Sequence, residues 1–209
     1  MEPKADLSIP TRSRLFRLHT ILAGLDEYEQ EGLYTSEEIS EMTGISALTL
    51  RKDISLLGQT TGGRGYRLRD LKSMIETQLI EGQTVKACLA GLGELGLTFL
   101  GQRRVLTPAV DIIAGFEGNT NRLERLNLSI PLYPAYDIEE VVQEKGIRLA
   151  VLTVCQDDVN KTVQRLVRGG IKGILNCTPS LLESPAPGVV IRHLDLMSEL
   201  KLLSSICMD

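Results

Sequence analysis

Thr84-Val-Lys-Ala-Cys-Leu-Ala90 is followed at once by Gly91-Leu-Gly-Glu-Leu-Gly96, so a short apolar run leads directly into the pattern G-x-G-x-x-G. The run predicts a buried strand, and the apolar residues 97–100 behind the pattern predict a helix. In such a turn Gly91 permits the tight bend, Gly93 lets the backbone approach a pyrophosphate, and Gly96 lets helix pack on strand. The helix N-terminus then offers free N–H groups and a favourable dipole to phosphate. The stretch therefore predicts a dinucleotide-binding unit.

The next strand supplies an acidic residue at its end. Residues 109–116 form a second apolar run that stops at Glu117, 26 residues after Gly91. A carboxylate at this point hydrogen-bonds the adenosine ribose hydroxyls and repels a 2′-phosphate. Strand, glycine pattern, helix, strand and acid together predict a site for NADH or NAD+ rather than for NADP(H).

Glu94 lies inside the glycine pattern and admits two interpretations. A carboxylate that points at the pyrophosphate weakens binding by like-charge repulsion, whereas one that points outward along the first helical turn complements the helix dipole. We favour the second interpretation and include the whole loop in the predicted cofactor site. The loop residues are Gly91, Leu92, Gly93, Glu94, Leu95 and Gly96.

Strands and helices alternate over the rest of the chain. The expected strands cover residues 149–154, 173–176 and 189–194, and the expected helices cover residues 158–168 and 195–206. This alternation is typical of a doubly wound parallel α/β sheet, the Rossmann fold. The last helix carries Leu196, Leu200 and Leu203 on one face.

The N-terminal third is expected to be helical. Apolar residues at helical spacing predict helices over residues 11–28, from Thr35 to Gly44, and over residues 47–57. Two short helices joined at a glycine are the helix-turn-helix pattern, whose second helix presents its N-terminal residues to the major groove. The candidate DNA-contacting residues of this helix are Ser46, Ala47, Thr49, Arg51 and Lys52.

Residues 59–68 are rich in glycine and predict a wing behind the third helix. Arg64 is the candidate phosphate or minor-groove contact at its tip, with Gly65 and Tyr66 beside it, and the alternative is a solvated hairpin. Between residues 46 and 72 six cations stand against two anions, although the whole chain has a net charge of −4. This basic stretch favours a DNA-reading element. A linker helix over residues 70–81 follows, so we place the domain boundary near residue 82.

Other function classes find less support. No apolar run approaches the ~18 residues of a membrane helix, and residues 1–10 lack the apolar core of a signal peptide, so we expect a cytoplasmic protein. The four cysteines form no CxxC pair and there are only two histidines, so we expect buried cysteines and no metal. His193 is the only histidine after the first third, and it lies within an expected strand. We therefore expect no catalytic residues and no enzyme.

Six parts of the sequence resemble the Rex family of redox-sensing transcriptional repressors, over nearly the whole chain. They are Arg51-Lys-Asp53, Gly63-Arg-Gly-Tyr66, Gly91 to Gly96 with Gly115-Phe-Glu117, Leu152-Thr-Val154, Gly170-Ile-Lys-Gly-Ile-Leu-Asn-Cys-Thr-Pro179 and His193-Leu-Asp-Leu196. The resemblance implies a winged helix DNA-binding domain with its linker helix at residues 1–82, a Rossmann domain at 83–193 and a C-terminal dimerisation helix at 194–209.

The resemblance also implies how the protein works. It implies a homodimer that exchanges its C-terminal helices and binds operator DNA, and that NADH, but not NAD+, abolishes this binding without being turned over. It adds further residues to the cofactor site and places an acidic switch residue beside the nicotinamide. The expected cleft residues are Thr153, Val154, Asn176, Thr178 and Pro179, and the expected switch residue is Asp195.

The chain departs from the family pattern at several positions. Cys155 stands where the family has proline, and Cys177 where it has an aromatic residue. In the first helix Leu18 and Thr20 stand where the family has a tyrosine and an arginine that engage the switch aspartate, and Arg17 lies one turn away. Two alternatives stay open. One is a divergent paralogue that reads another ligand or none and acts as a DNA-binding or interaction protein; the other is a minor oxidoreductase.

Overall fold

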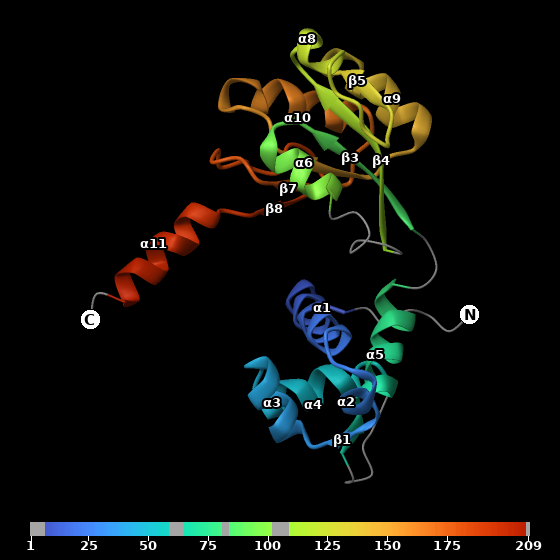
Figure 1. Cartoon of the computed structure of the whole chain (residues 1–209), viewed down its shortest axis with the longest axis vertical. Helices are drawn as coiled ribbons and strands as arrows, with labels where there is room; N and C mark the ends of the chain where they lie inside the picture. Colours follow the sequence, from blue (N-terminus) through green and yellow to red (C-terminus); the bar gives the residue numbers. More distant parts are fainter. Residues whose placement is uncertain (1–6, 59–64, 81–83, 102–108, 208–209) are drawn as a thin grey trace. The chain divides into compact units, whose positions relative to one another are not determined.

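The computed structural model describes residues 7–58, 65–80, 84–101 and 109–207. The chain divides into two compact units, residues 1–83 and residues 84–209 (Figure 1). Arg64 and the rest of the tip of the expected wing lie outside the described residues. Each unit has its own hydrophobic core.

Residues 1–83 form a helical unit with one two-stranded antiparallel sheet. The elements are α1 (Ile9–Ala23), α2 (Glu27–Glu31), β1 (Leu33–Tyr34), α3 (Ser36–Thr43), α4 (Ala47–Ser55), β2 (Tyr66–Arg67), α5 (Leu68–Ile75) and the π-helix η1 (Glu76–Ile80). β1 pairs with β2. Buried aliphatic side chains from α1, α3, α4 and α5 form the core of this unit.

The expected helix over residues 11–28 is two helices, so that prediction was wrong. α1 ends before Gly24, and α2 begins after Asp26. The Asp26 side chain accepts the Glu29 N–H at 2.8 Å, and the Glu29 carboxylate accepts the Asp26 N–H at 3.0 Å. This capping box starts a new helix, because both groups satisfy N–H donors that a continuous helix would bond internally.

α3 and α4 are separated by a turn of three residues whose geometry is set locally. Thr35 and Glu38 form the capping box that starts α3. Gly44 ends α3 with a φ of +68°, a conformation that favours glycine. The hydroxyl of Ser46 then accepts the Thr49 N–H at 3.2 Å and starts α4.

An ion pair between a half-buried arginine and a buried aspartate fastens α4 to α1. Arg14 donates from Nε to Asp53 Oδ2 at 2.6 Å and from Nη2 to Asp53 Oδ1 at 2.8 Å. Asp53 is buried, and its hydrogen bond raises the pKa of the Arg14 guanidinium. The bidentate geometry fixes the rotation of α4 and keeps Arg51 and Lys52 on its exposed side.

Residues 84–209 carry a six-stranded parallel sheet in the order β5-β4-β3-β6-β7-β8. The elements are β3 (Val85–Ala90), α6 (Glu94–Gly101), β4 (Val110–Glu117), α8 (Thr120–Leu123), β5 (Leu132–Pro134), the 3-10 helix η2 (Ala135–Asp137), α9 (Ile138–Lys145), β6 (Leu149–Leu152), the 3-10 helix η3 (Gln156–Asp158), α10 (Val159–Arg168), β7 (Gly173–Asn176), β8 (Val190–His193) and α11 (Leu196–Ile206). The strand order runs outward from β3 to β5 and then from β6 to β8. The prediction of a doubly wound parallel α/β sheet is therefore confirmed.

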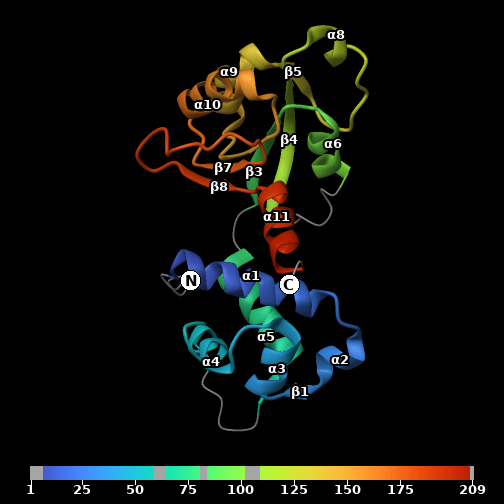
Figure 2. The same ribbon diagram turned by 90° about the vertical axis from the view of Figure 1, so that its left-hand side faces the viewer.

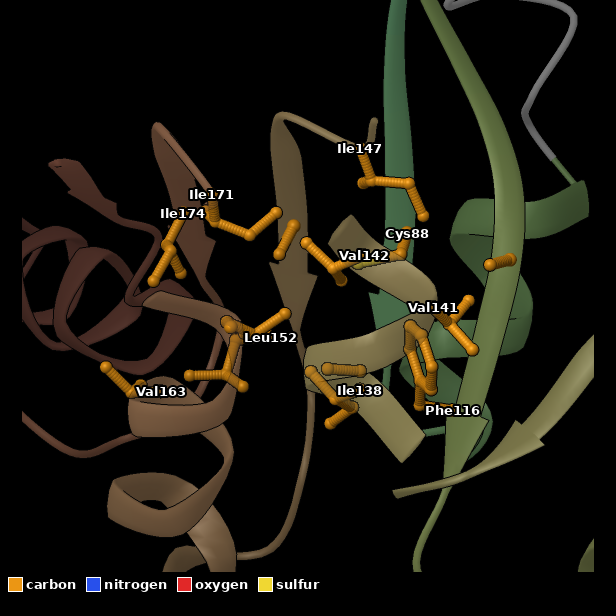
Figure 3. Close-up of a cluster of buried hydrophobic side chains, with 14 of the residues drawn as sticks. Cys88, Phe116, Ile138, Val141, Val142, Ile147, Leu152, Val163, Ile171 and Ile174 are labelled. Carbon is orange, nitrogen blue, oxygen red and sulfur yellow. The ribbon is translucent and has the colours of Figure 1, made fainter. Parts of the chain in front are cut away.

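Different helices cover the two faces of this sheet. Cys88 and Ala90 of β3 belong to the cluster that α9 and α10 cover, together with Phe116 (Figure 3). Ala87 and Leu89, which alternate with them, belong to the cluster on the face that α6 covers. Figure 2 shows α9 and α10 on one side of β3 and β4, with α6 on the other. The alternation along β3 thus gives each face an apolar surface.

Four elements between residues 118 and 148 were not predicted: α8, β5, η2 and α9. β5 has only three residues, too few for an alternating pattern. α9 does carry a helical signal, because Ile138, Val141 and Val142 are buried at helical spacing and Gly146 ends the helix with a φ of +64°.

α11 follows β8 after only two residues, Leu194 and Asp195. Every residue of α11 is exposed, so none of its side chains joins a core cluster of the described residues. Its large exposed apolar residues are Leu196, Met197, Leu200, Leu202, Leu203 and Ile206. An apolar helix without cover in its own chain indicates an interaction surface.

Candidate functional site

A cavity of about 930 Å³ opens at the carboxyl ends of β3, β4 and β6. The strand order of the sheet reverses between β3 and β6, and this switch point is where open α/β sheets bind ligands. Residues of the loops that follow these strands line the cavity, together with residues of η2, α8, α9 and α10.

The glycine-rich turn forms one wall of the cavity. Gly91 has a φ of +101°, and a Cβ there would lie 2.7 Å from backbone atoms of Thr153 and Val154. A Cβ at Gly96 would lie 2.2 Å from the carbonyl oxygen of Gly91. Nothing lies within 4 Å of a Cβ at Gly93, so the backbone faces open space there. A ligand phosphate can therefore approach the main chain at Gly93.

Thr153 fastens this turn to the loop that follows β6. Its hydroxyl donates to the carbonyl of Gly91 at 2.7 Å, and its N–H donates to the carbonyl of Ala90 at 2.8 Å. Thr153 and Val154 both line the cavity. These bonds fix the position of the turn through groups of this chain.

Glu117 ends β4 and lines the cavity with 13% of its side chain exposed. Its Oε1 accepts the N–H of Asn119 at 3.0 Å, and its Oε2 lies 3.8 Å from Nε of Arg122. Arg122 also donates from Nη2 to the carbonyl of Leu92 at 2.8 Å. The acid that the spacing predicted therefore has an arginine neighbour that the sequence pattern did not identify.

The structure gathers some of the predicted cofactor residues around this cavity and leaves others outside its lining. Those that line it are Gly91, Leu92, Gly93, Glu117, Thr153 and Val154. Those that do not are Glu94, Leu95, Gly96, Asn176, Thr178, Pro179 and Asp195. Glu94 is exposed at the first turn of α6, which agrees with the outward-pointing interpretation of its carboxylate.

Asn176 ends β7 and is fully buried in a closed hydrogen-bond network. Its Oδ1 accepts the N–H of Thr178 at 3.1 Å, so its Nδ2 is the donor to Ser180 O at 2.7 Å and to His193 Nδ1 at 3.0 Å. His193 therefore accepts at Nδ1 and donates from Nε2 to the carbonyl of Leu182 at 3.0 Å. Both ring nitrogens serve the structure, as expected for a structural histidine.

Asp195 is exposed and caps α11. Its Oδ1 accepts the N–H groups of Met197 and Ser198 at 3.1 and 3.0 Å, and its Oδ2 accepts the Ser198 hydroxyl at 2.5 Å. The Ser198 hydrogen bonds lower the pKa of the Asp195 carboxyl, so the side chain is held ionised. Within one chain, both carboxylate oxygens of Asp195, the expected switch residue, are thus engaged in hydrogen bonds to the helix that it caps.

Two cysteines depart from the expectation that all four are buried. Cys88 is buried and Cys177 is half-buried, but Cys155 and Cys207 are exposed. Cys155 lines the cavity and donates from Sγ to Asp158 Oδ2 at 3.1 Å, which raises the pKa of its thiol. Periodicity could not reveal this exposure, because Cys155 lies in the loop after β6.

Three further cavity residues were not identified from the sequence. Tyr136 in η2 is exposed, and Lys161 and Arg165 of α10 bring positive charge to the wall. Arg165 donates from Nη1 to the carbonyl of Ala135 at 3.0 Å. This wall of the cavity forms because η2 and α10 pack against each other, and a contact between segments so far apart in sequence leaves no local pattern.

The candidate DNA-contacting residues lie mainly at the start of α4. Ser46, Arg51 and Lys52 are exposed, and Ala47 and Thr49 are half-buried. DNA could contact the exposed residues among them without any rearrangement of the α4 backbone.

Arg51 is held by α3 in the described structure. Its Nη1 donates to the Ser36 hydroxyl at 2.7 Å and to Glu37 Oε1 at 2.8 Å. The Arg51 hydrogen bond lowers the pKa of the Glu37 carboxyl. An exposed ion pair of this kind is weak, so a phosphate or a base edge can compete for the guanidinium.

The two described wing residues are built into the unit rather than projecting from it. Tyr66 in β2 is buried in the core. Gly65 has a φ of +91°, and a Cβ there would lie 2.7 Å from the carbonyl oxygen of Tyr34. They therefore fix the base of the expected wing against β1.

Among the described residues, no three His, Cys, Asp or Glu side chains are grouped so that they could hold a metal ion. A separate search of the described residues finds no helix that is long and apolar enough to cross a membrane.

Comparison with known sequences gives three matches of note. Residues 84–180 match the family model described as a CoA binding domain. The chain is 32% identical over 204 residues to the redox-sensing transcriptional repressor Rex of Listeria welshimeri, covering 97% of this chain and 94% of the relative. It is also 32% identical to the protein of the same name from Lactococcus lactis, with the same coverage.

Solved structures of a repressor called RSP match nearly the whole chain, and one of them is described as that of a Rex-family repressor. The structure of RSP alone superposes with a TM-score of 0.84 at 26% identity, covering 96% of this chain and 94% of that one. RSP in complex with NADH gives 0.81 at 25% identity, with the same coverage. RSP in complex with NAD+ and operator DNA gives 0.83 at 26% identity, covering 95% and 91%.

Proposed function

The chain belongs to the Rex family of redox-sensing transcriptional repressors, and from this premise we propose that it represses transcription by binding operator DNA and releases that DNA when it binds NADH. The observation that carries the proposal is the cavity at the sheet switch point. It combines an open backbone at Gly93 with an acid at Glu117, in a chain that is similar over 97% of its length to redox-sensing repressors.

The dinucleotide would lie along the carboxyl ends of β3 and β4. Its pyrophosphate would meet the backbone of the turn at Gly93, and its adenosine ribose would meet Glu117. Thr153 and Val154 would line the path toward the nicotinamide. When bound, the cofactor supplies a redox-dependent charge on its nicotinamide, and the residues of this chain bind and orient it.

Operator DNA would be read by residues 1–83. The pair α3 and α4 has the helix-turn-helix arrangement, and β1 with β2 would form the base of the wing. The N-terminal turn of α4 exposes Ser46, and its outer side exposes Arg51 and Lys52. A helix with this exposure suits the major groove.

A homodimer built through exchanged α11 helices would cover the apolar residues that are exposed in one chain. Leu196, Leu200 and Leu203 lie on one face of α11 and are each more than half exposed. Burying an aliphatic side chain contributes about 1.5–3 kcal/mol, so an exposed face of three leucines strongly favours association.

The protein would act as a sensor and not as an enzyme. His193 is the histidine of residues 84–209, and both of its ring nitrogens are engaged in structural hydrogen bonds. A group so engaged has no free nitrogen to relay a proton. The curated relatives named above are transcriptional repressors.

Reciprocal linkage provides the test. NADH can dissociate the DNA complex only if it binds the DNA-free arrangement more tightly, and DNA must then weaken NADH binding by the same factor. The DNA would be selected by this protein from a randomised pool, and NADH and NAD+ would be titrated by calorimetry onto the free and the DNA-bound protein. We expect DNA to weaken NADH binding and to leave NAD+ binding nearly unchanged.

Arg51→Gln is the matched control, because it should abolish the DNA complex and leave NADH binding intact. Equal effects of DNA on both nucleotides would contradict redox sensing. The same experiment separates the second candidate, a DNA-binding paralogue that does not respond to NADH. That candidate is favoured by Asp195, which caps its own helix, and by Thr20, which stands where the family arginine is expected.

A further inference from the structure

Arg122 is a charged side chain of the cavity that the glycine motif does not account for. It projects from α8, and its guanidinium spans the space between two loops. Nη2 donates to the carbonyl of Leu92 at 2.8 Å, in the glycine-rich turn, while Nε lies 3.8 Å from Glu117 Oε2, at the end of β4. Arg122 therefore connects the two features that define the expected ribose and pyrophosphate positions.

The two partners differ in exposure. The Arg122 side chain is 45% exposed and that of Glu117 is 13% exposed. Glu117 is further fixed by the N–H of Asn119, which its Oε1 accepts at 3.0 Å. The carboxylate is thus the anchored member of the pair, and the guanidinium is the member that can turn toward a ligand.

The chemistry of the pair bears directly on ligand choice. An acid at the end of the second strand hydrogen-bonds a 2′-hydroxyl, whereas an arginine beside it accommodates a 2′-phosphate. A guanidinium also matches phosphate oxygens with two parallel N–H bonds. This cavity holds both groups side by side, and Glu117 neutralises Arg122 while repelling a phosphate.

The other charged groups that line the cavity are Asp158, Lys161 and Arg165. Lys161 and Arg165 belong to α10, across the cavity from α8, and Arg165 is engaged with the carbonyl of Ala135 at 3.0 Å. Within the described residues neither of them forms an ion pair with Glu117, whereas Arg122 does. Arg122 is therefore the cation of this cavity whose charge Glu117 balances.

We propose that Arg122 is a second specificity-determining residue of the cavity, so that the choice between unphosphorylated and 2′-phosphorylated adenine dinucleotides is set by the Glu117–Arg122 pair and not by Glu117 alone. While Glu117 is charged, Arg122 is held on the turn and the pocket selects a free 2′-hydroxyl. Without that charge, Arg122 becomes a receptor for a 2′-phosphate. The proposal rests on the proposed function, because it concerns the same dinucleotide site.

The test compares NADH and NADPH binding, by calorimetry on the full chain, in a double-mutant cycle. Glu117→Gln keeps an oxygen acceptor for the Asn119 N–H, removes the charge, and replaces the oxygen beside Arg122 by an amide NH2 that cannot pair with the guanidinium. We expect it to shift the ratio of the two affinities toward NADPH by about tenfold or more, the scale of one hydrogen bond to a charged group. Adding Arg122→Gln should abolish that shift, and adding Arg122→Lys should preserve part of it.

Arg165→Gln in the Glu117→Gln background is the matched control, because it removes one positive charge from the same cavity but leaves Arg122 in place. It should retain the shift toward NADPH. The proposal is overturned if E117Q/R122Q keeps the full shift, if Arg165→Gln abolishes it equally, or if E117Q produces none. Absence of NADH binding by the unmodified chain would instead overturn the proposed function, and this inference with it.

Discussion

The two halves of the parallel sheet end in different ways, although the family resemblance assigns cofactor contacts to both. β3, β4 and β6 end in an open cavity lined by Gly93, Glu117 and Thr153. β7 and β8 end in a closed network in which Asn176 is fully buried and His193 is bonded at both ring nitrogens. The first region takes its shape from contacts within one chain, whereas the second leads into α11, whose apolar face is exposed.

This contrast separates two kinds of site residue. The adenosine end of the proposed cofactor site is already formed, because its hydrogen bonds and its glycine contacts are local to three neighbouring strands. Contacts from the other end, including any made by Asp195, depend on what covers α11. The following predictions test this difference, from the largest expected effect to the smallest.

Leu200→Asp should dissociate the proposed dimer. Each copy loses the burial of one leucine, so two copies lose about 3 kcal/mol or more of association free energy, or about a hundredfold in the dissociation constant. Sedimentation equilibrium measures this change, and Ser205→Asp is the control because it adds the same charge at another position around α11. Binding of ADP-ribose should be unchanged in L200D, since the cavity is complete in one chain. Its loss would show that the first region also needs the partner.

Gly96→Ala should distort the glycine-rich turn of the cavity, although Gly96 itself does not line the cavity. The new Cβ would lie 2.2 Å from the carbonyl oxygen of Gly91, and backbone at that position cannot move aside. Overpacking of this kind costs about 3 kcal/mol, which we expect to see as weaker NADH binding and a lower unfolding temperature. Gly101→Ala in the same helix meets nothing within 4 Å, so it should leave NADH binding unaltered and should not lower the unfolding temperature. Equal behaviour of the two variants would refute the packing argument.

Asn176→Ala should lower the free energy of unfolding more than it lowers the free energy of NADH binding. It removes the partners of Thr178, Ser180 and His193 in a buried site, at a cost of about 2 kcal/mol of unfolding free energy. Denaturant unfolding with and without NADH separates the two effects, and Ser180→Ala, which keeps the backbone acceptor, is the control. A large loss of NADH affinity at unchanged stability would instead support the ligand contact that the family resemblance assigns to Asn176.

Cys155→Pro should have the smallest effect and a stabilising sign. Cys155 has a φ of −65°, the value that a proline ring imposes, so the folded loop is not strained while the unfolded chain loses freedom. We expect a gain of about 0.5–1 kcal/mol in unfolding free energy, measured by denaturant titration. A loss of stability would mean that the Cys155–Asp158 hydrogen bond contributes more than this entropy term.

The sequence was most informative where the signal is local. The strand before Gly91, the glycine turn and the acid at Glu117 follow from short-range pattern and are present in the structure. The break between α1 and α2 was missed, although Asp26 and Glu29 carry the capping-box residues, because the apolar spacing continues across it.

Long-range contacts could not be derived in the same way. Arg122 reaches the carbonyl of Leu92, thirty positions away, and Arg14 reaches Asp53, thirty-nine positions away. Such pairs depend on how the loops of the sheet or the helices of the bundle are brought together. The closed network around Asn176 has the same origin, since it joins residues of β7, its loop and β8.

The connection from β8 to α11 has a mechanical consequence. Only Leu194 and Asp195 separate the strand from the helix, and Asp195 is itself fixed by three hydrogen bonds to the first turn of α11. A joint this short and this well bonded contains almost no slack, so a rotation of the strand end must be transmitted as torque to the helix axis. In a dimer held by α11, a twist of one sheet would therefore turn the helix and, through it, the sheet of the partner.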